Sequence, residues 1–190
     1  MATPLSPPLK DICTQLEAAS LRAQNIVAGL SASVLMQRPA PNSWSIAECL
    51  GHLTLTAQAY EPVIRQGIDE GRRKRLFKSG DHFRMEWMAK LLAWWLEPPY
   101  RLKSRSPSAF EPIVQDPVNA LPEFLYWQQR VMELLAAADG LALDRVQIVS
   151  PFSSRMRYNV YAAFHLIAVH ERRHLWQAEQ VLRKNPNQET

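Results

Sequence analysis

Apolar residues recur at steps of three and four positions along most of this chain, which is the pattern of amphipathic helices. In the first stretch, from residue 8 to residue 30, the pattern runs through Leu9, Ile12, Leu16, Ala19, Ala23, Ile26 and Leu30. No segment shows the sustained alternation of apolar and polar residues that is typical of a β-strand. The sequence therefore predicts an all-α chain.

Capping and helix-breaking residues set the limits of the expected helices. Ser45-x-x-Glu48 forms a capping box before the second apolar run, and Pro62 should kink that helix or end its regular part. Gly29 and Gly140 are expected to stop two other helices. The expected helices cover residues 8–30, a run from 46 through 64, 81–96, 122–140 and 156–183, with irregular chain from 97 to 121.

Four of these helices are long, which predicts a four-helix bundle with the 81–96 helix as a short accessory element. The roughly 50 residues between the second and third core helices leave room for a crossover to a parallel neighbour. All 190 residues fit a single domain, residues 1–190, with its own core. Trp87, Trp94 and Trp95 are expected to pack the short helix against the bundle, with a pocket wall or a dimer face as alternatives.

The charge and cysteine content limit the classes of partner. The net charge is +4 and is densest at Arg72-Arg73-Lys74-Arg75, where a short run after a helix end is more typical of a solvated connection than of a phosphate-binding patch. No apolar run reaches the roughly 18 residues that cross a bilayer. Two cysteines and no secretory leader favour the cytoplasm. We therefore expect neither a nucleic-acid partner nor a membrane.

His170 and His174 lie four residues apart on the apolar stripe of the last helix, in positions where a core would otherwise take leucine. An i,i+4 pair is displaced by only about 40° around a helix, so both imidazoles share one face. Polar groups on a buried face need partners, and two imidazoles one turn apart can bind one transition-metal ion. This pattern favours a metal site over two hydrogen-bonded core histidines.

The same run reads His-Glu-x-x-His, which is the signature of zincin peptidases. That class is disfavoured because the residues after His174 supply neither the glycine nor the third histidine of one zincin group. A second zincin group takes a downstream glutamate on a separate helix as its third ligand. Glu179 lies on the same helix as the two histidines and is turned about 140° away from them, so it cannot take that place. We expect Glu171 to point away from the bundle axis, towards solvent or a neighbouring chain, and not to act as a general base.

Four other residues could contribute to such a site, and their positions in the sequence do not decide whether any of them does. His52 lies on the flank of the second helix's apolar stripe, where a hydrogen-bonded core histidine is the simpler interpretation. Cys49 is either a fourth ligand or a small core residue. Glu48 could orient His52, although the capping box already explains it. His82 is expected to be exposed, unless a lid formed by the crossover brings it over the metal.

Two motifs in this order resemble the DinB-like (YfiT-like) superfamily: Leu35-x-x-Arg38-Pro39-x-Pro41-x-x-Trp44-Ser45-Ile46-x-Glu48-x-Leu50-x-His52-Leu53, and His170-Glu171-x-x-His174-x-x-Gln177. The resemblance extends over essentially the whole chain. It implies a four-helix bundle of up-down-down-up topology with a long crossover and a metal held by three histidines. Those histidines match His52, His170 and His174 here. Homodimers are frequent in that family, so the resemblance also allows a homodimer.

Members of the family include thiol-dependent S-transferases and isomerases that use bacillithiol, mycothiol or glutathione, and others are described as metal-dependent hydrolases. Three neutral imidazoles leave coordination positions open, as in catalytic sites, and nitrogen ligands suit Zn²⁺ or Ni²⁺. The sequence therefore predicts a metal-dependent enzyme that acts on a small molecule, either as a transferase with a low-molecular-weight thiol as co-substrate or as a hydrolase. The alternative is a non-catalytic helical bundle with a structural or regulatory metal.

Overall fold

The computed structural model describes residues 5–80, 82–99 and 110–184. Its helices are α1 (Pro7–Val27), α2 (Ala32–Met36), α3 (Ile46–Arg73), α4 (Trp87–Leu96), α5 (Ala120–Ala138) and α6 (Val160–Lys184), with 3-10 turns η2 (Pro117–Asn119) and η3 (Leu143–Arg145). Two strands, β1 (Gln147–Ser150) and β2 (Ser153–Asn159), form an antiparallel hairpin. The chain is therefore mostly helical, and the hairpin is the departure from the predicted all-α chain.

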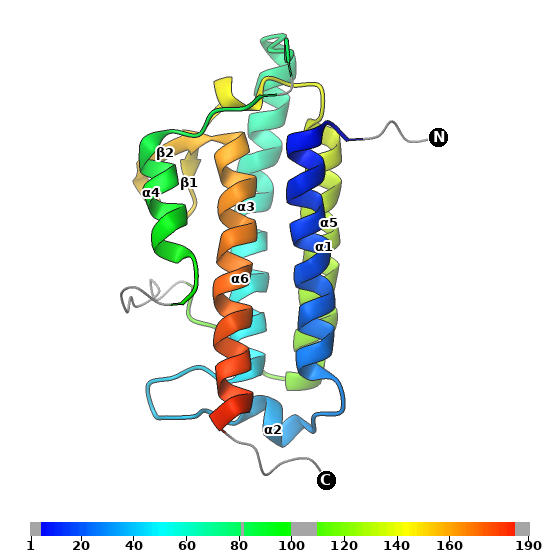
Figure 1. Ribbon diagram of the computed structural model, residues 1–190, viewed down its shortest axis with the longest axis vertical. Coiled ribbons are helices and arrows are strands. Elements are labelled where there is room, and N and C mark those ends of the chain that lie inside the picture. Colours follow the sequence, from blue (N-terminus) through cyan, green and yellow to red (C-terminus); the bar gives the residue numbers. More distant parts are fainter. Residues whose placement is uncertain (1–4, 81, 100–109, 185–190) are drawn as a thin grey trace.

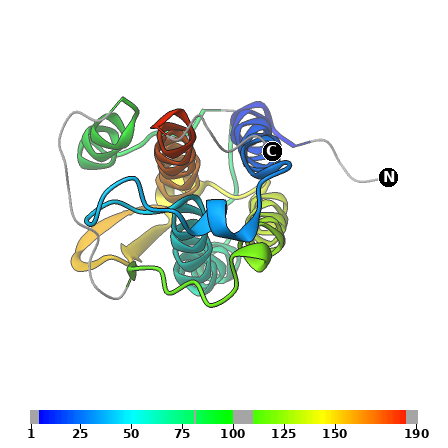
Figure 2. The same cartoon turned by 90° about the horizontal axis from the view of Figure 1, so that it is seen from below.

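The four long helices α1, α3, α5 and α6 lie side by side (Figure 1). Helices α1 and α6 run from top to bottom in that view, whereas α3 and α5 run from bottom to top. Each of α1 and α3 packs against both α5 and α6. The end-on view shows α4 outside this group, beside α6 and on the same side of the molecule as the hairpin (Figure 2). Consequently α3 and α5 are parallel, as the long connection between them allows.

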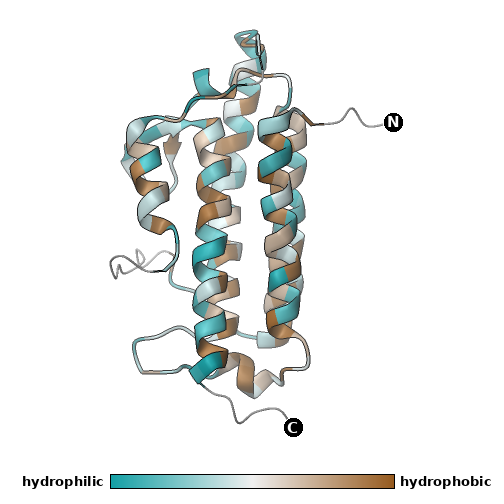
Figure 3. Ribbon diagram, viewed as in Figure 1, coloured by the Kyte–Doolittle hydropathy of each residue, from teal (hydrophilic) through white to brown (hydrophobic). Residues whose placement is uncertain are grey.

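The periodic apolar residues of the sequence form the core. All but the last member of the apolar stripe predicted for the first helix are buried, and α1 packs this face on α5 and α6. Hydrophobic and hydrophilic residues alternate in bands along the long helices (Figure 3). Gly29, with a φ of 74°, follows the end of α1, and Gly140, with a φ of 87°, follows the end of α5. Both glycines adopt the left-handed conformation that commonly ends a helix.

Several predicted helix boundaries are wrong. Pro62 lies inside α3, which continues to Arg73, so the proline does not end it. Helix α4 begins at Trp87 rather than in the low eighties, and α5 begins at Ala120, two residues before Pro122. Proline lacks only its own N–H, and near a helix start that group has no intrahelical partner, so α5 tolerates Pro122 in its first turn.

The β-hairpin was not predicted, and it displaces the start of the last helix from residue 156 to Val160. Its strands pair Ile148 with Tyr158, and both of these side chains are buried. Asn159 ends β2 and caps α6, since its Oδ1 accepts a hydrogen bond from the N–H of Ala162 at 2.8 Å. The hairpin therefore fixes the point at which α6 begins.

Two apolar clusters occupy the core, one at each end of the long helices. Leu16 of α1, Ala57 of α3, Val131 of α5 and Val169 of α6 belong to the first cluster. The second holds Ala19, Leu53, Phe124 and Leu175 from the same four helices. Between these levels lie buried polar side chains: Thr54 and Thr56 of α3, Gln128 of α5, and Glu171, Arg173 and His174 of α6. The core is thus divided by a polar layer.

Candidate metal centre

Three histidines meet in this polar layer. His52 comes from the second turn of α3, and His170 and His174 come from successive turns of α6. The Nε2 atom of His170 lies 3.2 Å from Nε2 of His52 and 3.1 Å from Nε2 of His174. One ring nitrogen from each of the three lies within 4.8 Å of the others. The structure therefore brings the predicted ligands to a common point.

The spacing of these nitrogens fits a small divalent cation. A zinc-type ion with Zn–N bonds of about 2.0–2.1 Å and tetrahedral angles places its nitrogen ligands about 3.3–3.4 Å from each other. The two Nε2–Nε2 distances of 3.1 and 3.2 Å are close to this value. Only small side-chain adjustments would be needed to seat an ion between the three rings.

Hydrogen bonds on the far side of two rings fix which nitrogens face the centre as lone pairs. Nδ1 of His52 lies 2.7 Å from the carbonyl oxygen of Phe110, which can only accept, so Nδ1 carries the hydrogen. Nδ1 of His174 donates in the same way to Oε1 of Gln177 at 3.1 Å. A neutral imidazole has one N–H, so Nε2 of each ring is left without hydrogen. This arrangement is typical of metal-binding histidines.

His170 supplies the observation that tests the fit. Its Nδ1 is buried and makes no hydrogen bond with any residue that the structure describes. Nε2 of His170 can donate its single hydrogen well to only one of the two facing lone pairs. The three converging nitrogens therefore share at most one hydrogen, and hydrogen bonding among themselves cannot satisfy them. A cation satisfies all three, so the donor set fits a metal.

The local charge state also favours metal binding. Burial lowers the pKa of His52, and it lowers the pKa values of His170 and His174 well below the ordinary value. Repulsion among the three rings and from Arg173 lowers the pKa values of His170 and His174 further. The imidazoles are thus neutral near pH 7, and a neutral imidazole is the form that binds a metal.

Aromatic side chains flank the cluster. The ring of Trp44 lies 4.7 Å from that of His52 and 5.4 Å from that of His174, centroid to centroid. Phe152, from the hairpin turn, lies 6.3 Å from His170 and 4.4 Å from Phe110. Sequence reasoning did not assign these aromatic residues to the site. For Trp44 a signal existed, since it directly precedes the capping box that opens α3.

The predicted capping box is present and positions Trp44 and His52. Ser45 accepts a hydrogen bond from the N–H of Glu48 at 3.2 Å, and the Glu48 carboxylate accepts one from the N–H of Ser45 at 2.8 Å. Both carboxylate oxygens of Glu48 are also bound by the Arg38 guanidinium. Glu48 therefore fixes the first turn of α3, whereas the hydrogen-bond partner of His52 is the Phe110 carbonyl.

The other candidates lie outside the cluster. Cys49 is buried among apolar residues of the second core cluster, and burial raises the pKa of its thiol. His82 is exposed in the segment before α4. Neither belongs to the group of ligand atoms formed by the three histidines. At the basic run, Arg73 and Lys74 pair with Glu70 at the end of α3.

The prediction that Glu171 points towards solvent is wrong. Its side chain is buried, and Oε2 accepts a hydrogen bond from Nε2 of Gln128 at 2.8 Å. Gln128 also donates to the carbonyl oxygen of Leu16 at 2.9 Å, so this side of α6 faces α1 and α5. Burial raises the pKa of Glu171 to about 8. The error arose because α6 is covered on more than one side, whereas the prediction assumed one buried stripe.

These features define a class: a mostly helical protein with three histidines, two of them buried and one partly exposed, supplied by two neighbouring helices, whose ring nitrogens converge. A family model described as the DinB superfamily matches residues 15–178, a range that includes all three histidines. The chain belongs to the DinB superfamily. No curated protein and no solved structure gives a significant match. Within the described residues, none of the helices combines the length and apolar character needed to span a bilayer.

Proposed function

We propose that this chain is a metal-dependent enzyme of the DinB superfamily in which His52, His170 and His174 hold one divalent ion. The convergence of their Nε2 atoms carries this proposal. In the same proposal, residues 1–190 form one domain, and the four long helices form the up-down-down-up bundle of the family. The nitrogen ligands suit Zn²⁺ or Ni²⁺.

The proposed reaction is transfer or conjugation of a low-molecular-weight thiol to a small electrophile, with hydrolysis as the second reaction type. A bound zinc-type ion lowers the pKa of a water or thiol ligand and so supplies a nucleophile near neutral pH. The protein's own contribution is positioning. The Phe110 carbonyl and Gln177 orient two rings through their Nδ1 hydrogens, and Trp44 shields the same two rings.

One observation favours a second candidate function. His52 and His174 are buried, and the rings of Trp44 and Phe152 lie beside the cluster. A fully enclosed ion would have a structural or regulatory role, because a catalytic ion keeps a position open to substrate. Activity assays with the metal-loaded protein separate these two candidates.

The first experiment measures metal content. Purified protein is supplied with Zn²⁺ or Ni²⁺, desalted and measured by elemental analysis. We expect about one ion per chain, since three imidazoles form one site, and loss of stoichiometric metal in His170→Ala. His165→Ala is the matched control, because His165 lies on the same helix but outside the cluster. Equal metal content in the two variants, or none in the wild type, would contradict the site.

The second experiment measures activity. Metal-loaded wild type, His170→Ala and His165→Ala are each supplied with bacillithiol, mycothiol or glutathione and a panel of electrophiles, and then with ester and amide substrates. Turnover by wild type and His165→Ala, but not by His170→Ala, supports the enzyme. Equal rates for all three proteins across both panels remove the case for catalysis and leave the structural role.

A further inference from the structure

Helix α4 exposes its large apolar side chains and buries its small ones. Trp87, Leu91 and Trp94 are 72%, 55% and 57% exposed, and their spacing of four and three residues places them along one face. Ala89 and Ala93 are the buried residues of this helix, so the prediction that Trp87 packs it against the bundle is wrong. We call the face formed by Trp87, Met88, Leu91 and Trp94 the α4 face.

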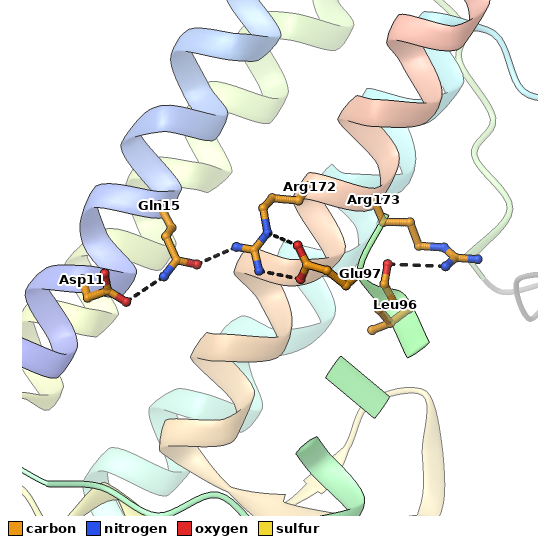
Figure 4. A network of polar contacts seen from close by, with 6 residues as sticks. All are labelled: Asp11, Gln15, Leu96, Glu97, Arg172 and Arg173. Carbon is orange, nitrogen blue, oxygen red and sulfur yellow. Dashed lines mark hydrogen bonds and ion pairs between the residues drawn. The ribbon is translucent and has the colours of Figure 1, made fainter. Parts of the chain in front are cut away.

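Polar contacts at its C-terminal end fix α4 in this orientation. Arg172 of α6 forms two hydrogen bonds of 2.8 Å with the carboxylate of Glu97 and a third with the side chain of Gln15 in α1 (Figure 4). Arg173 donates to the carbonyl oxygen of Leu96, the last residue of α4. Rotation of the helix to bury the α4 face would break these contacts. The face is therefore a fixed part of the surface.

The outer face of the β-hairpin carries cations and adjoins the start of α4. Tyr158 of β2 is buried, so the residues that alternate with it point away from the core. These include Arg155 and Arg157, which are exposed. Gln147 of β1 lies on the same outer face and donates at 2.6 Å to Glu86, the residue before α4. The hairpin and α4 therefore share one side of the molecule (Figure 2).

Exposed cations lie on and beside the α4 face. Lys90 is three residues after Trp87, about 60° around the helix, and so flanks the face. Arg84 precedes α4, and its carbonyl oxygen accepts a hydrogen bond of 2.7 Å from Asn159 at the end of β2. Among the residues that the structure describes, no acidic side chain forms an ion pair with Arg84, Lys90, Arg155 or Arg157.

The acidic groups of the same region are turned inwards or already bound. Oε1 of Glu86 accepts the hydrogen bond from the hairpin, and Oε2 is buried. The carboxylate of Glu97 is bound by Arg172. Asp144 is half-buried and accepts a hydrogen bond of 3.3 Å from the N–H of Arg84. The exposed charge that these residues present beside the α4 face is therefore mainly positive.

We propose that the α4 face binds the surface of an anionic lipid bilayer, with the hairpin cations against the headgroups. Tryptophan rings prefer the headgroup level of a membrane, where one end is apolar and the other is hydrated. Met88 and Leu91 supply apolar surface beside them. Lys90 can lay its apolar stem along the face while its ammonium reaches the headgroups. Lysine and arginine are the side chains that anionic lipid attracts.

Binding of this kind needs no spanning helix. The sequence disfavoured a membrane because no apolar run is long enough to cross a bilayer, and within the described residues no helix could cross one. A helix that lies on the surface needs only one apolar face with cations beside it. A second copy of the chain is a poorer partner, since a two-fold contact would bring the same cations of both subunits together. The proposal is independent of the metal and of the reaction.

The first test compares two leucines of similar exposure on different helices. Leu91 is 55% exposed on the α4 face, and Leu21 is 59% exposed on α1. The full-length wild type, Leu91→Glu and Leu21→Glu are each mixed with vesicles of phosphatidylcholine and phosphatidylglycerol in equal parts, and the Kd is measured by cosedimentation across a lipid series. We expect the wild type and Leu21→Glu to bind alike. Leu91→Glu should bind at least roughly 10-fold more weakly, because its carboxylate would lose hydration at the lipid boundary.

The second test removes cations at opposite ends of α6. Arg155→Gln/Arg157→Gln removes two charges from the hairpin that precedes α6, and Arg183→Gln/Lys184→Gln removes two exposed charges from the last turn of α6. A helix of 25 residues is about 37 Å long, several times the Debye length of about 10 Å. The hairpin variant should bind the mixed vesicles roughly 30-fold more weakly, about five- to sixfold for each charge, whereas the α6 variant should match the wild type.

A wild type that leaves the mixed vesicles unbound, or that binds pure phosphatidylcholine vesicles equally well, overturns the proposal. Equal affinities of Leu91→Glu and Leu21→Glu, or of the two charge variants, overturn the assignment to α4 and the hairpin. Circular dichroism checks that each variant keeps the helical content of the wild type, and Trp87→Glu replaces Leu91→Glu if that variant unfolds. A wild type that binds no vesicles but sediments as a dimer, which Leu91→Glu dissociates, would assign the face to a second copy instead.

Discussion

Replacement of Glu48 with alanine removes the contact that holds the entry to α3. The N–H of Ser45, in a fully buried residue, would lose its acceptor, which costs about 1–3 kcal/mol. The ion pair with Arg38 adds at most about 1 kcal/mol, because 52% of the Arg38 side chain is exposed and solvent screens the pair. Together these changes lower the free energy of unfolding by roughly 1–4 kcal/mol.

For a domain of 150–250 residues, each kcal/mol shifts the melting temperature by roughly 2–4 °C. Glu48→Ala should therefore lower Tm by roughly 2–16 °C in thermal unfolding followed by circular dichroism at pH 7. Glu61→Ala is the matched control on the same helix, since Glu61 also pairs with an arginine, Arg65, but caps nothing. Solvent screens this pair, because half of the Arg65 side chain is exposed, so its loss should lower Tm by much less. Equal shifts in Tm for the two variants would refute this account of the cap.

Two further predictions concern stability. Burial acts to raise the pKa of Glu48, but the hydrogen bonds described above lower it below its ordinary 4.5. The stability that the ionised Glu48 carboxylate contributes is therefore complete above pH 4.5 and is lost as pH falls through the folded-state pKa. In urea unfolding, the difference in free energy of unfolding between wild type and Glu48→Gln should therefore become smaller in acid. Gly67→Ala would place a Cβ 2.8 Å from a Val160 methyl and 2.9 Å from an Ile148 methyl, and should cost about 1–3 kcal/mol. Gly80→Ala, with nothing within 4 Å, should be nearly neutral in the same assay.

The long helices could be predicted because each buries a continuous stripe, and a stripe is visible as a period in the sequence. The capping box at Ser45 was equally visible, since both of its residues are local. The hairpin was not visible for a physical reason. Strand β1 has four residues and β2 exposes most of its polar ones, so neither supplies enough alternation to be distinguished from a loop.

In the candidate site too, features set by neighbouring residues could be predicted, whereas features set by the packing of distant helices could not. His170 and His174 were found from their spacing alone, because an i,i+4 pair on a buried stripe needs no knowledge of the neighbouring helices. His52 came from the family resemblance, since its approach to the pair depends on how α3 packs on α6. The partner of His52 could not be predicted at all. It is the backbone carbonyl of Phe110, and every residue carries such a group whatever its type.

The polar layer explains why a single turn of α6 can carry both a buried carboxylate and a histidine cluster. His170 and His174 face α3, whereas Glu171 lies about 100° around the helix and reaches Gln128 of α5. The Glu171–Gln128 contact satisfies a polar pair inside the core, whereas the three ring nitrogens that converge on the histidine side share at most one hydrogen. A polar layer between two apolar clusters is costly unless every group has a partner. A divalent cation would satisfy the three converging ring nitrogens, whereas the glutamate of the His-Glu-x-x-His run belongs to the other side of the layer.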